Sequence, residues 1–469
     1  MPGTTELPIS AAQGGDGAAA DAANAAAAQP ASAPRRPPRA YYIDWLRVAL
    51  TALVVAHHVF FVAARQPGAG GDASFPLWHY LDIDKDLGLA IFSGMFIEGN
   101  QSWFMTAFFF ISGLFVPGSC DRKGLRRYLA DRTLRLLLPT LLFSCFGPPA
   151  CLAIAQAASG GELSTLPSLK TAGNVFVWYW KTYVIPIPTG PVWFTMLLFW
   201  LDLIYVTGRA IAGGCRSCSA RRRAAKAGAA SGAGGAGAPV AIAFDVKAPS
   251  PAAAKGADAP PFSIGATLAG GFAVAATMFL AAYVIRALPG VSFNYWFGTA
   301  FFSFMPGYVL VYALAFGLGI LAAAERTDAL RRVPARVGYA SLALGAVLYC
   351  LLPCFLFLTS LGDLVGPRNS LLFTLWQQFF ACAWIAGLLV TLRELGNVRP
   401  GRVGGVVIGA AYATYLVHPV VVTGLLAAFA AIPGMSWAAR AFAMAPVAVV
   451  ASWAIGAALK AIPGASRVL

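Results

Sequence analysis

The sequence predicts an all-α, polytopic integral membrane protein, a bundle of about ten transmembrane helices, and three observations support that fold class. Apolar residues make up 58% of the 469-residue chain and charged residues only 11%, whereas an ordinary soluble domain carries about 25% charged residues. So few charges cannot cover the surface of a water-soluble body of this size. The apolar residues gather in runs of about twenty, the length that a helix needs to cross the hydrocarbon of a bilayer. Lys and Arg lie in short clusters between these runs, as topology signals do.

The chain begins with a segment, residues 1–40, that we expect to be a disordered tail. It is rich in Ala, Gly, Pro and Ser and holds no apolar core of the kind found in a secretory signal. Ten apolar segments follow, and each is expected to cross the membrane. They are 43–64, 97–117, 134–157, 192–212, 263–287, 300–324, 336–359, 370–392, 404–430 and 436–461. A further segment, 174–187, is aromatic but short and broken by proline, which indicates an interfacial or re-entrant piece.

A long break in the apolar pattern divides the membrane domain into two halves. Residues 214–261 run from a basic start into a stretch rich in Gly, Ala, Pro and Ser without periodic apolar residues. We expect a disordered cytoplasmic loop there. The first half of the membrane domain, with spans one to four, is then 41–213, and the second half, with spans five to ten, is 262–469.

The basic residues also indicate the orientation of the chain in its membrane. With the N-terminus in the cytoplasm, 26 of the 34 Lys and Arg residues fall in cytoplasmic regions, 7 fall in outside loops or the adjoining helix ends, and Arg47 lies inside the first span. This distribution follows the positive-inside rule. Because the number of spans is even, the C-terminus is expected in the cytoplasm as well.

Two other function classes are disfavoured by the same residues. The net charge of +15 could suggest a nucleic-acid-binding protein, but the basic residues are not interleaved with aromatic ones as on such a surface. Cys215 and Cys218 form a Cys-x2-Cys pair, yet no second pair follows to complete a zinc site. We expect neither a nucleic-acid partner nor a metal.

The first predicted span carries ionisable side chains, each of which costs about 2.5–3.5 kcal/mol in mid-membrane and therefore needs a reason. Arg47 and His58 are eleven residues apart, which on a helix is three turns plus about 20°, and about 16 Å along the axis. They share a face, whereas His57 points about 80° away from Arg47. The pair can serve two ends of one long ligand. The alternatives are an arginine that reaches the headgroups and a histidine bonded to a neighbouring helix.

Four stretches of the chain, in order, resemble motifs of the acyltransferase family 3 membrane proteins. Asp-Trp-Leu-Arg, ending at Arg47, is followed after ten residues by His58, as in the family's opening helix. Phe-Phe-Phe-Ile-Ser-Gly-Leu-Phe (108–115) is similar to its aromatic Ser-Gly segment. Tyr-Leu-Ala-Asp-Arg-Thr-Leu-Arg-Leu-Leu-Leu-Pro (128–139) resembles its Arg-x2-Arg-Leu-x2-Pro entry to the third helix, and Ala-Thr-Tyr-Leu-Val-His-Pro-Val (413–420) its late Tyr-Leu-x-His motif.

The resemblance runs from about 41 to 460, apart from 214–261, and it implies an O-acyltransferase in a multi-pass membrane domain. Such an enzyme moves an acyl group, often acetyl, from a cytoplasmic coenzyme A thioester. The acceptor hydroxyl commonly belongs to a sugar or glycan. The family's essential histidine corresponds to His58 and its paired arginine to Arg47.

The chemistry of the individual side chains suggests which of them would bind the donor and which would react. Arg47, near the cytoplasmic mouth, can hold a phosphate of acyl-CoA, and Arg132 and Arg135 at the start of the third span can join it. A neutral His58 can take the proton from the acceptor hydroxyl, or accept the acyl group itself.

Three further polar residues have both a structural and a functional interpretation. Ser112, beside a glycine, lets helices approach closely or contributes to the site. Tyr415 and His418 share a helix face at i, i+3, and they form either a structural polar cluster or part of the acceptor site.

The alternative function is a proton-coupled secondary transporter of a small molecule. His58, His418 and Asp202 would then carry the proton. The absence of a convincing internal repeat and the shortage of membrane carboxylates disfavour this function.

Overall fold

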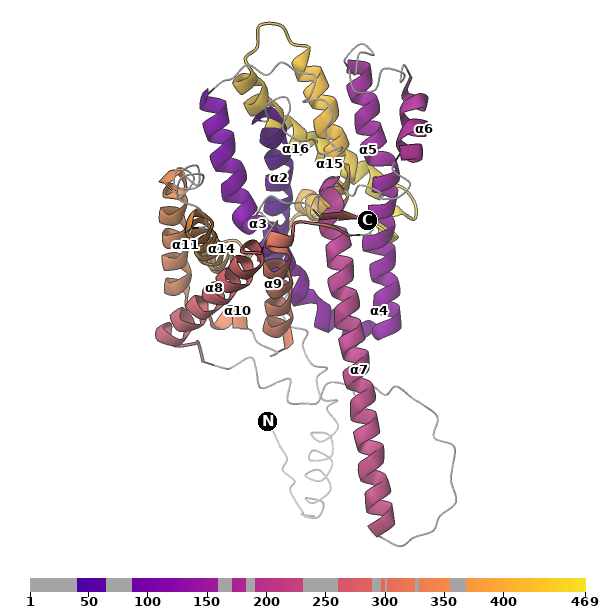
Figure 1. The fold of residues 1–469 in the computed structure, drawn as a ribbon, viewed down its shortest axis with the longest axis vertical. Coiled ribbons are helices and arrows are strands. Elements are labelled where there is room, and N and C mark those ends of the chain that lie inside the picture. Colours follow the sequence, from indigo (N-terminus) through magenta and orange to yellow (C-terminus); the bar gives the residue numbers. More distant parts are fainter. Residues whose placement is uncertain are drawn as a thin grey trace, which may run out of the picture. The chain divides into compact units, whose positions relative to one another are not determined.

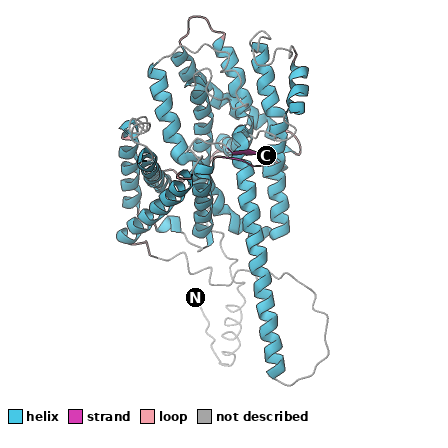
Figure 2. Cartoon of the chain, in the orientation of Figure 1, coloured by secondary structure: helices cyan, strands magenta, loops and turns pink. Residues whose placement is uncertain are grey.

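The computed structural model describes residues 40–64, 87–158, 171–182, 190–230, 260–288, 297–299, 302–324, 329–354 and 368–469. Most of these residues are helical, and the described strands form one short pair (Figure 2). The fold is the all-α helical bundle that the sequence predicts. Of the predicted disordered tail, 1–39 lies outside the described residues.

Each predicted span corresponds to a helix in the structure. Those of the first half are α2 (Tyr41–Ala64), α3 (Leu87–Lys123), the continuous run of α4 (Leu125–Arg132), η2 (Thr133–Leu137) and α5 (Leu138–Ala158), and η3 (Gly190–Val192) with α7 (Trp193–Ala230). Those of the second half are α8 (Ile264–Arg286), α9 (Pro306–Ala324), α11 (Ala335–Cys350), α14 (Arg368–Leu395), α15 (Arg402–Ala430) and α16 (Trp437–Ala461) (Figure 1). Three short helices, α6 (Ala172–Thr182), α10 (Ala329–Arg332) and η5 (Ala465–Arg467), complete the helices of the described residues.

Within the described residues, nine helices are long and apolar enough to cross a membrane, so the chain is a multi-pass integral membrane protein. The remaining predicted span, 336–359, which is the seventh in chain order, corresponds to α11. With 16 residues, this helix is about 24 Å long, which is less than the hydrocarbon thickness of about 30 Å. Residues 355–367, which follow it closely, lie outside the described residues.

Two predicted boundaries differ from the structure for reasons of local chemistry. α7 does not end at 213 but continues to Ala230, so the first part of the predicted loop 214–261 is helical. The alanines, arginines and lysine of that part are strong helix formers, and 231–259 lies outside the described residues. The predicted span 300–324 begins only at Pro306, because proline is favoured at the first helical position.

The strand pair lies directly before α9. β1 (Phe297–Thr299) pairs with β2 (Phe302–Phe304) in antiparallel register, with Phe297 opposite Phe304. Their aromatic and β-branched residues favour extended backbone, although the apolar composition alone predicted a helix from residue 300.

α2 and α15 run parallel, side by side, although they lie far apart in the sequence. The backbone N–H of Tyr42 donates to Asn397 Oδ1 at 3.3 Å, and Trp45 Nε1 donates to Val398 O at 2.9 Å, just before α15 begins. α2 also packs against α3 and α16. The first span is therefore enclosed by neighbours whose side chains can meet its inward face.

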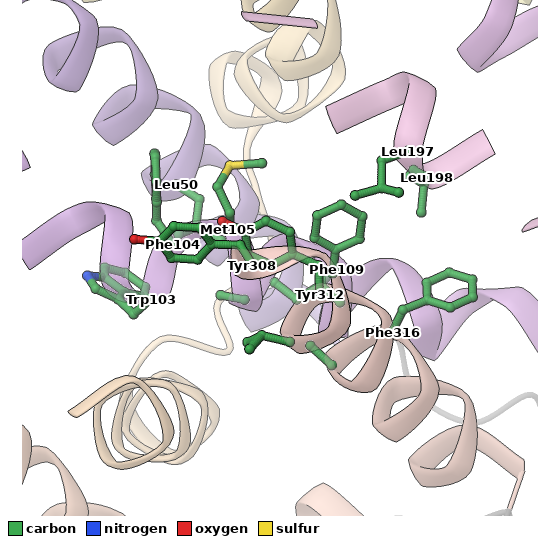
Figure 3. Close-up of a cluster of buried hydrophobic side chains, with 14 of the residues drawn as sticks. Leu50, Trp103, Phe104, Met105, Phe109, Leu197, Leu198, Tyr308, Tyr312 and Phe316 are labelled. Atoms are coloured by element: carbon green, nitrogen blue, oxygen red, sulfur yellow. The ribbon is translucent and has the colours of Figure 1, made fainter. Parts of the chain in front are cut away.

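An aromatic core joins α2, α3, α7 and α9 (Figure 3). The rings of Phe109 and Tyr312 stack with centroids 4.9 Å apart, and Tyr308 stacks on Tyr312 at 5.7 Å. Leu50 brings the first span into the same cluster (Figure 3). The motif-bearing helices are thus fixed in one packed unit.

Candidate active site

Arg47 and His58 lie on one unbroken helix, α2, so their predicted separation of about 16 Å along the axis holds. Arg47 is exposed, and its carbonyl accepts a hydrogen bond from Thr51 Oγ1 at 2.9 Å. His58 is half-buried. The structure therefore gives the two residues different environments, one at the protein surface and one partly enclosed.

His58 meets His418 of α15, and this contact joins two separate sequence motifs. His418 Nε2 lies 3.2 Å from His58 Nδ1, and the ring centroids are 4.8 Å apart. Each Nδ1 also faces a backbone carbonyl: His58 Nδ1 lies 2.8 Å from Val54 O and His418 Nδ1 2.6 Å from Tyr415 O. His418 is completely buried. The parallel packing of α2 and α15 thus produces a pair of hydrogen-bonded imidazoles inside the membrane domain.

His57 is adjacent in sequence but lies in a different environment. Its ring packs against Phe104 with centroids 5.1 Å apart and meets His58 edge-on at 5.5 Å. The side chain is buried, and its Nδ1 has no hydrogen-bond partner among the described residues. His57 is therefore an aromatic packing residue and a natural control for His58.

Tyr415 connects α15 to the start of the fourth span. Its hydroxyl donates to Pro191 O at 2.5 Å, and its ring meets Phe194 edge-on at 6.1 Å. The side chain is buried. These contacts favour the structural interpretation of Tyr415, while its carbonyl binds the His418 ring.

The Ser-Gly motif lies where α3 crosses α9. Ser112 is half-buried, and the neighbouring Gly113 has its α-carbon directly against α9. A Cβ added to Gly113 would collide with Phe316 O and lie 3.1 Å from the α-carbon of Gly319. Small residues allow this close approach of two backbones, so the motif has a packing function here.

Arg132 is engaged in a buried ion pair that the sequence analysis did not identify. Its Nε lies 3.2 Å from Asp202 Oδ2 and donates to Tyr128 OH at 3.0 Å, while Tyr128 OH donates to Asp202 Oδ1 at 2.6 Å. Asp202 is completely buried, and the Arg132 side chain is 20% exposed. The cluster ties α4 to α7 and neutralises the charge that was expected to attract phosphate. Arg132 and Asp202 lie 70 residues apart on different helices, and nothing in the sequence alone indicates that their side chains pair.

Arg135 lies in the π-helical turn η2, a rare geometry that is frequent at functional sites. Its side chain is 47% exposed and pairs with Asp131 at 3.5 Å. Its carbonyl accepts a hydrogen bond from Tyr412 OH at 2.5 Å. Tyr412 precedes His418 by six residues of α15, about 9 Å along the axis. The Arg135 backbone therefore contacts α15 through a residue that lies N-terminal to His418.

A second buried arginine, Arg286 at the end of α8, was not singled out in the sequence. Its guanidinium donates to Gln377 Oε1 at 2.7 Å, to Thr374 Oγ1 at 2.9 Å and to Gly307 O at 3.2 Å. Gln377 in turn donates to Ser102 Oγ at 3.3 Å. This network links α8, α9, α14 and α3 by polar contacts. The sequence holds one indication of this network, an arginine in the last turn of an apolar span. A charged residue at the end of a span is equally expected where the helix enters an ordinary loop.

The described residues contain no group of three or more His, Cys, Asp or Glu side chains arranged to hold a metal ion. The side chains of Cys215 and Cys218 lie outside the described part of the chain.

Comparison with known protein families gives one match that covers most of the chain. The model of acyltransferase family 3, described as an acyltransferase domain, matches residues 40–457. The comparisons with curated proteins and with solved structures gave no match. The matched range includes all four motifs and both members of the imidazole pair. The chain therefore belongs to acyltransferase family 3 and is an acyltransferase.

Proposed function

We propose that this acyltransferase transfers an acyl group, with acetyl as the first candidate, from cytoplasmic acyl-CoA to a hydroxyl group of a saccharide acceptor. The observation that carries the proposal is the placement of His58. Its half-buried imidazole lies deep in the first span, on the helix face that also carries Arg47. Histidine is the side chain most often used to move a proton near neutral pH.

The donor would enter from the side on which Arg47 lies. Guanidinium groups bind phosphate well, and the long uncharged arm of coenzyme A can follow α2 inward toward His58. Arg135 is the second proposed phosphate contact because its side chain is exposed and its backbone contacts α15, the helix that carries His418. Arg132 is a weaker candidate, since Asp202 already balances its charge.

Two routes of acyl transfer fit this arrangement. In the direct route, His58 takes the hydroxyl proton as the acceptor oxygen attacks the thioester carbonyl. The carbon–sulfur bond then breaks, and the coenzyme A thiolate leaves with that proton. In the second route, the imidazole nitrogen attacks the thioester, the carbon–sulfur bond breaks, and the coenzyme A thiolate leaves. The hydroxyl oxygen then takes the acyl group from the nitrogen, and the hydroxyl proton goes to the thiolate. Both routes need a reactive nitrogen lone pair on His58, which faces the acceptor hydroxyl in the direct route and the thioester carbonyl in the second.

The test is an acyl-transfer assay with purified protein, labelled acetyl-CoA and a saccharide with free hydroxyl groups. We expect wild-type protein to consume thioester and label the acceptor, and His58→Ala to lose about 10²-fold or more of that rate. His57→Phe is the matched control, because it keeps the packing against Phe104. Undiminished turnover in His58→Ala would remove the assignment, and solute flux without acyl transfer would favour a transporter.

A further inference from the structure

The contact between His58 and His418 has a consequence for the identity of the reacting atom. We propose that His418 is a positioning residue: together with the Val54 carbonyl it keeps the hydrogen of His58 on Nδ1, so that His58 Nε2 is the atom that takes the proton or the acyl group. This inference rests on the proposed function, and it adds the residue that positions His58 and the nitrogen atom that reacts.

The first step concerns the two backbone carbonyls. A carbonyl oxygen only accepts hydrogen bonds, so a nitrogen at hydrogen-bond distance from it must carry the hydrogen. His418 Nδ1 lies 2.6 Å from Tyr415 O, and His58 Nδ1 lies 2.8 Å from Val54 O. Both rings therefore carry a hydrogen on Nδ1.

The second step concerns the nitrogens that face each other. A neutral imidazole has one hydrogen, so neutral His418 with its hydrogen on Nδ1 presents a lone pair at Nε2. That lone pair lies 3.2 Å from His58 Nδ1 and accepts from its N–H, which is shared with Val54 O. Reversing the donor would require a doubly protonated His418 and would place the His58 Nδ1 lone pair against the Val54 carbonyl. The structure assigns one consistent neutral arrangement, with the His58 lone pair on Nε2.

The third step concerns the charge that develops during the reaction. When His58 Nε2 gains a proton or an acyl group, the ring becomes positively charged in a poorly solvated site. The His418 lone pair then receives a stronger hydrogen bond from Nδ1 and can take that proton, in which case the charge moves to a ring held by Tyr415 O. Return of the proton to His58 Nδ1 as Nε2 loses its proton or acyl group restores the starting state.

The complete burial of His418 also favours a positioning role. Its Nε2 faces His58 Nδ1, and Tyr415 O holds its other nitrogen. A buried imidazole bonded on both sides has little freedom to change orientation. His418 thus acts through His58 rather than on the substrate.

The test combines kinetics with a spectroscopic readout of the tautomer. We expect His418→Leu to lower kcat by about 10²-fold or more and to leave KM for acetyl-CoA nearly unchanged, because only His58 is affected. His418→Gln keeps an acceptor at the position of Nε2, and we expect it to retain kcat within about tenfold of wild type. Wild-type activity in His418→Leu, with His58→Ala inactive, would overturn the inference but leave the proposed function intact.

Nitrogen-15 chemical shifts of the labelled histidines provide the measurement that does not depend on turnover. In wild-type protein, with His58→Ala and His57→Phe used for assignment, we expect His58 to show a protonated Nδ1 and an unprotonated Nε2. In His418→Gln this pattern should persist. A wild-type His58 protonated at Nε2 would overturn the inference, whatever the activity. The predicted shifts combined with full activity in His58→Ala would instead refute the proposed function alone.

Discussion

The crossing of α3 and α9 allows a stability prediction with an internal control. A Cβ at Gly319 would collide with Phe110 O and lie 3.0 Å from the α-carbon of Gly113, and both are backbone atoms that cannot turn aside. At Gly317, two residues earlier on α9, a Cβ would meet nothing within 4 Å. Replacing either glycine with alanine gains about 1 kcal/mol of helix propensity. This gain cancels in a comparison of the two variants and leaves the steric cost alone.

Overpacking of a tight contact costs about 1–3 kcal/mol, and we expect Gly319→Ala to be less stable than Gly317→Ala by that amount. At about 2–4 °C per kcal/mol, the difference in thermal midpoint should be several degrees. The assay is thermal unfolding of both variants purified in the same detergent. Equal midpoints would refute the claim that α3 and α9 meet backbone to backbone.

Three further predictions concern the buried and exposed arginines. Arg286→Ala should lower the free energy of unfolding by about 2 kcal/mol or more, because Gln377 loses its buried donor, and thermal unfolding measures this loss. Asp202→Ala should cost about 3 kcal/mol by leaving Arg132 without its counter-charge, and a double variant in which Arg132 is also replaced by leucine should recover part of that loss. Arg135→Ala should raise KM for acetyl-CoA about tenfold with kcat nearly unchanged, since one charge-assisted contact is worth about 1.5 kcal/mol; a KM equal to that of wild type would exclude a role in donor binding.

Hydropathy was sufficient to locate the helices because a membrane demands long apolar segments with satisfied backbones. Every predicted span has a helix, from α2 to α16. Composition was less informative about where the helices begin and end. The helix that continues to Ala230 and the strands before Pro306 depend on local propensity rather than on hydropathy.

The candidate site could be predicted only where its residues share one helix. Arg47 and His58 lie on α2, so helical periodicity alone relates them. The contact between His58 and His418 depends on the parallel packing of α2 against α15, which a single sequence does not encode locally. The pairing of Arg132 with Asp202 is of the same kind. The Arg132–Asp202 pair shows that a basic residue at the start of a helix can bind a buried carboxylate of the protein instead of a phosphate.

The most direct test of the central claim compares two neighbouring histidines in a single-turnover experiment. Purified wild-type protein, His58→Ala and His57→Phe would each be mixed in excess with labelled acetyl-CoA and a saccharide acceptor, and the first-order rate of label transfer measured. We predict that His57→Phe keeps a rate within a few-fold of wild type while His58→Ala loses about 10²-fold or more. Equal rates in the two variants would contradict the account, because the imidazole beside His418 would then have no part in the chemistry.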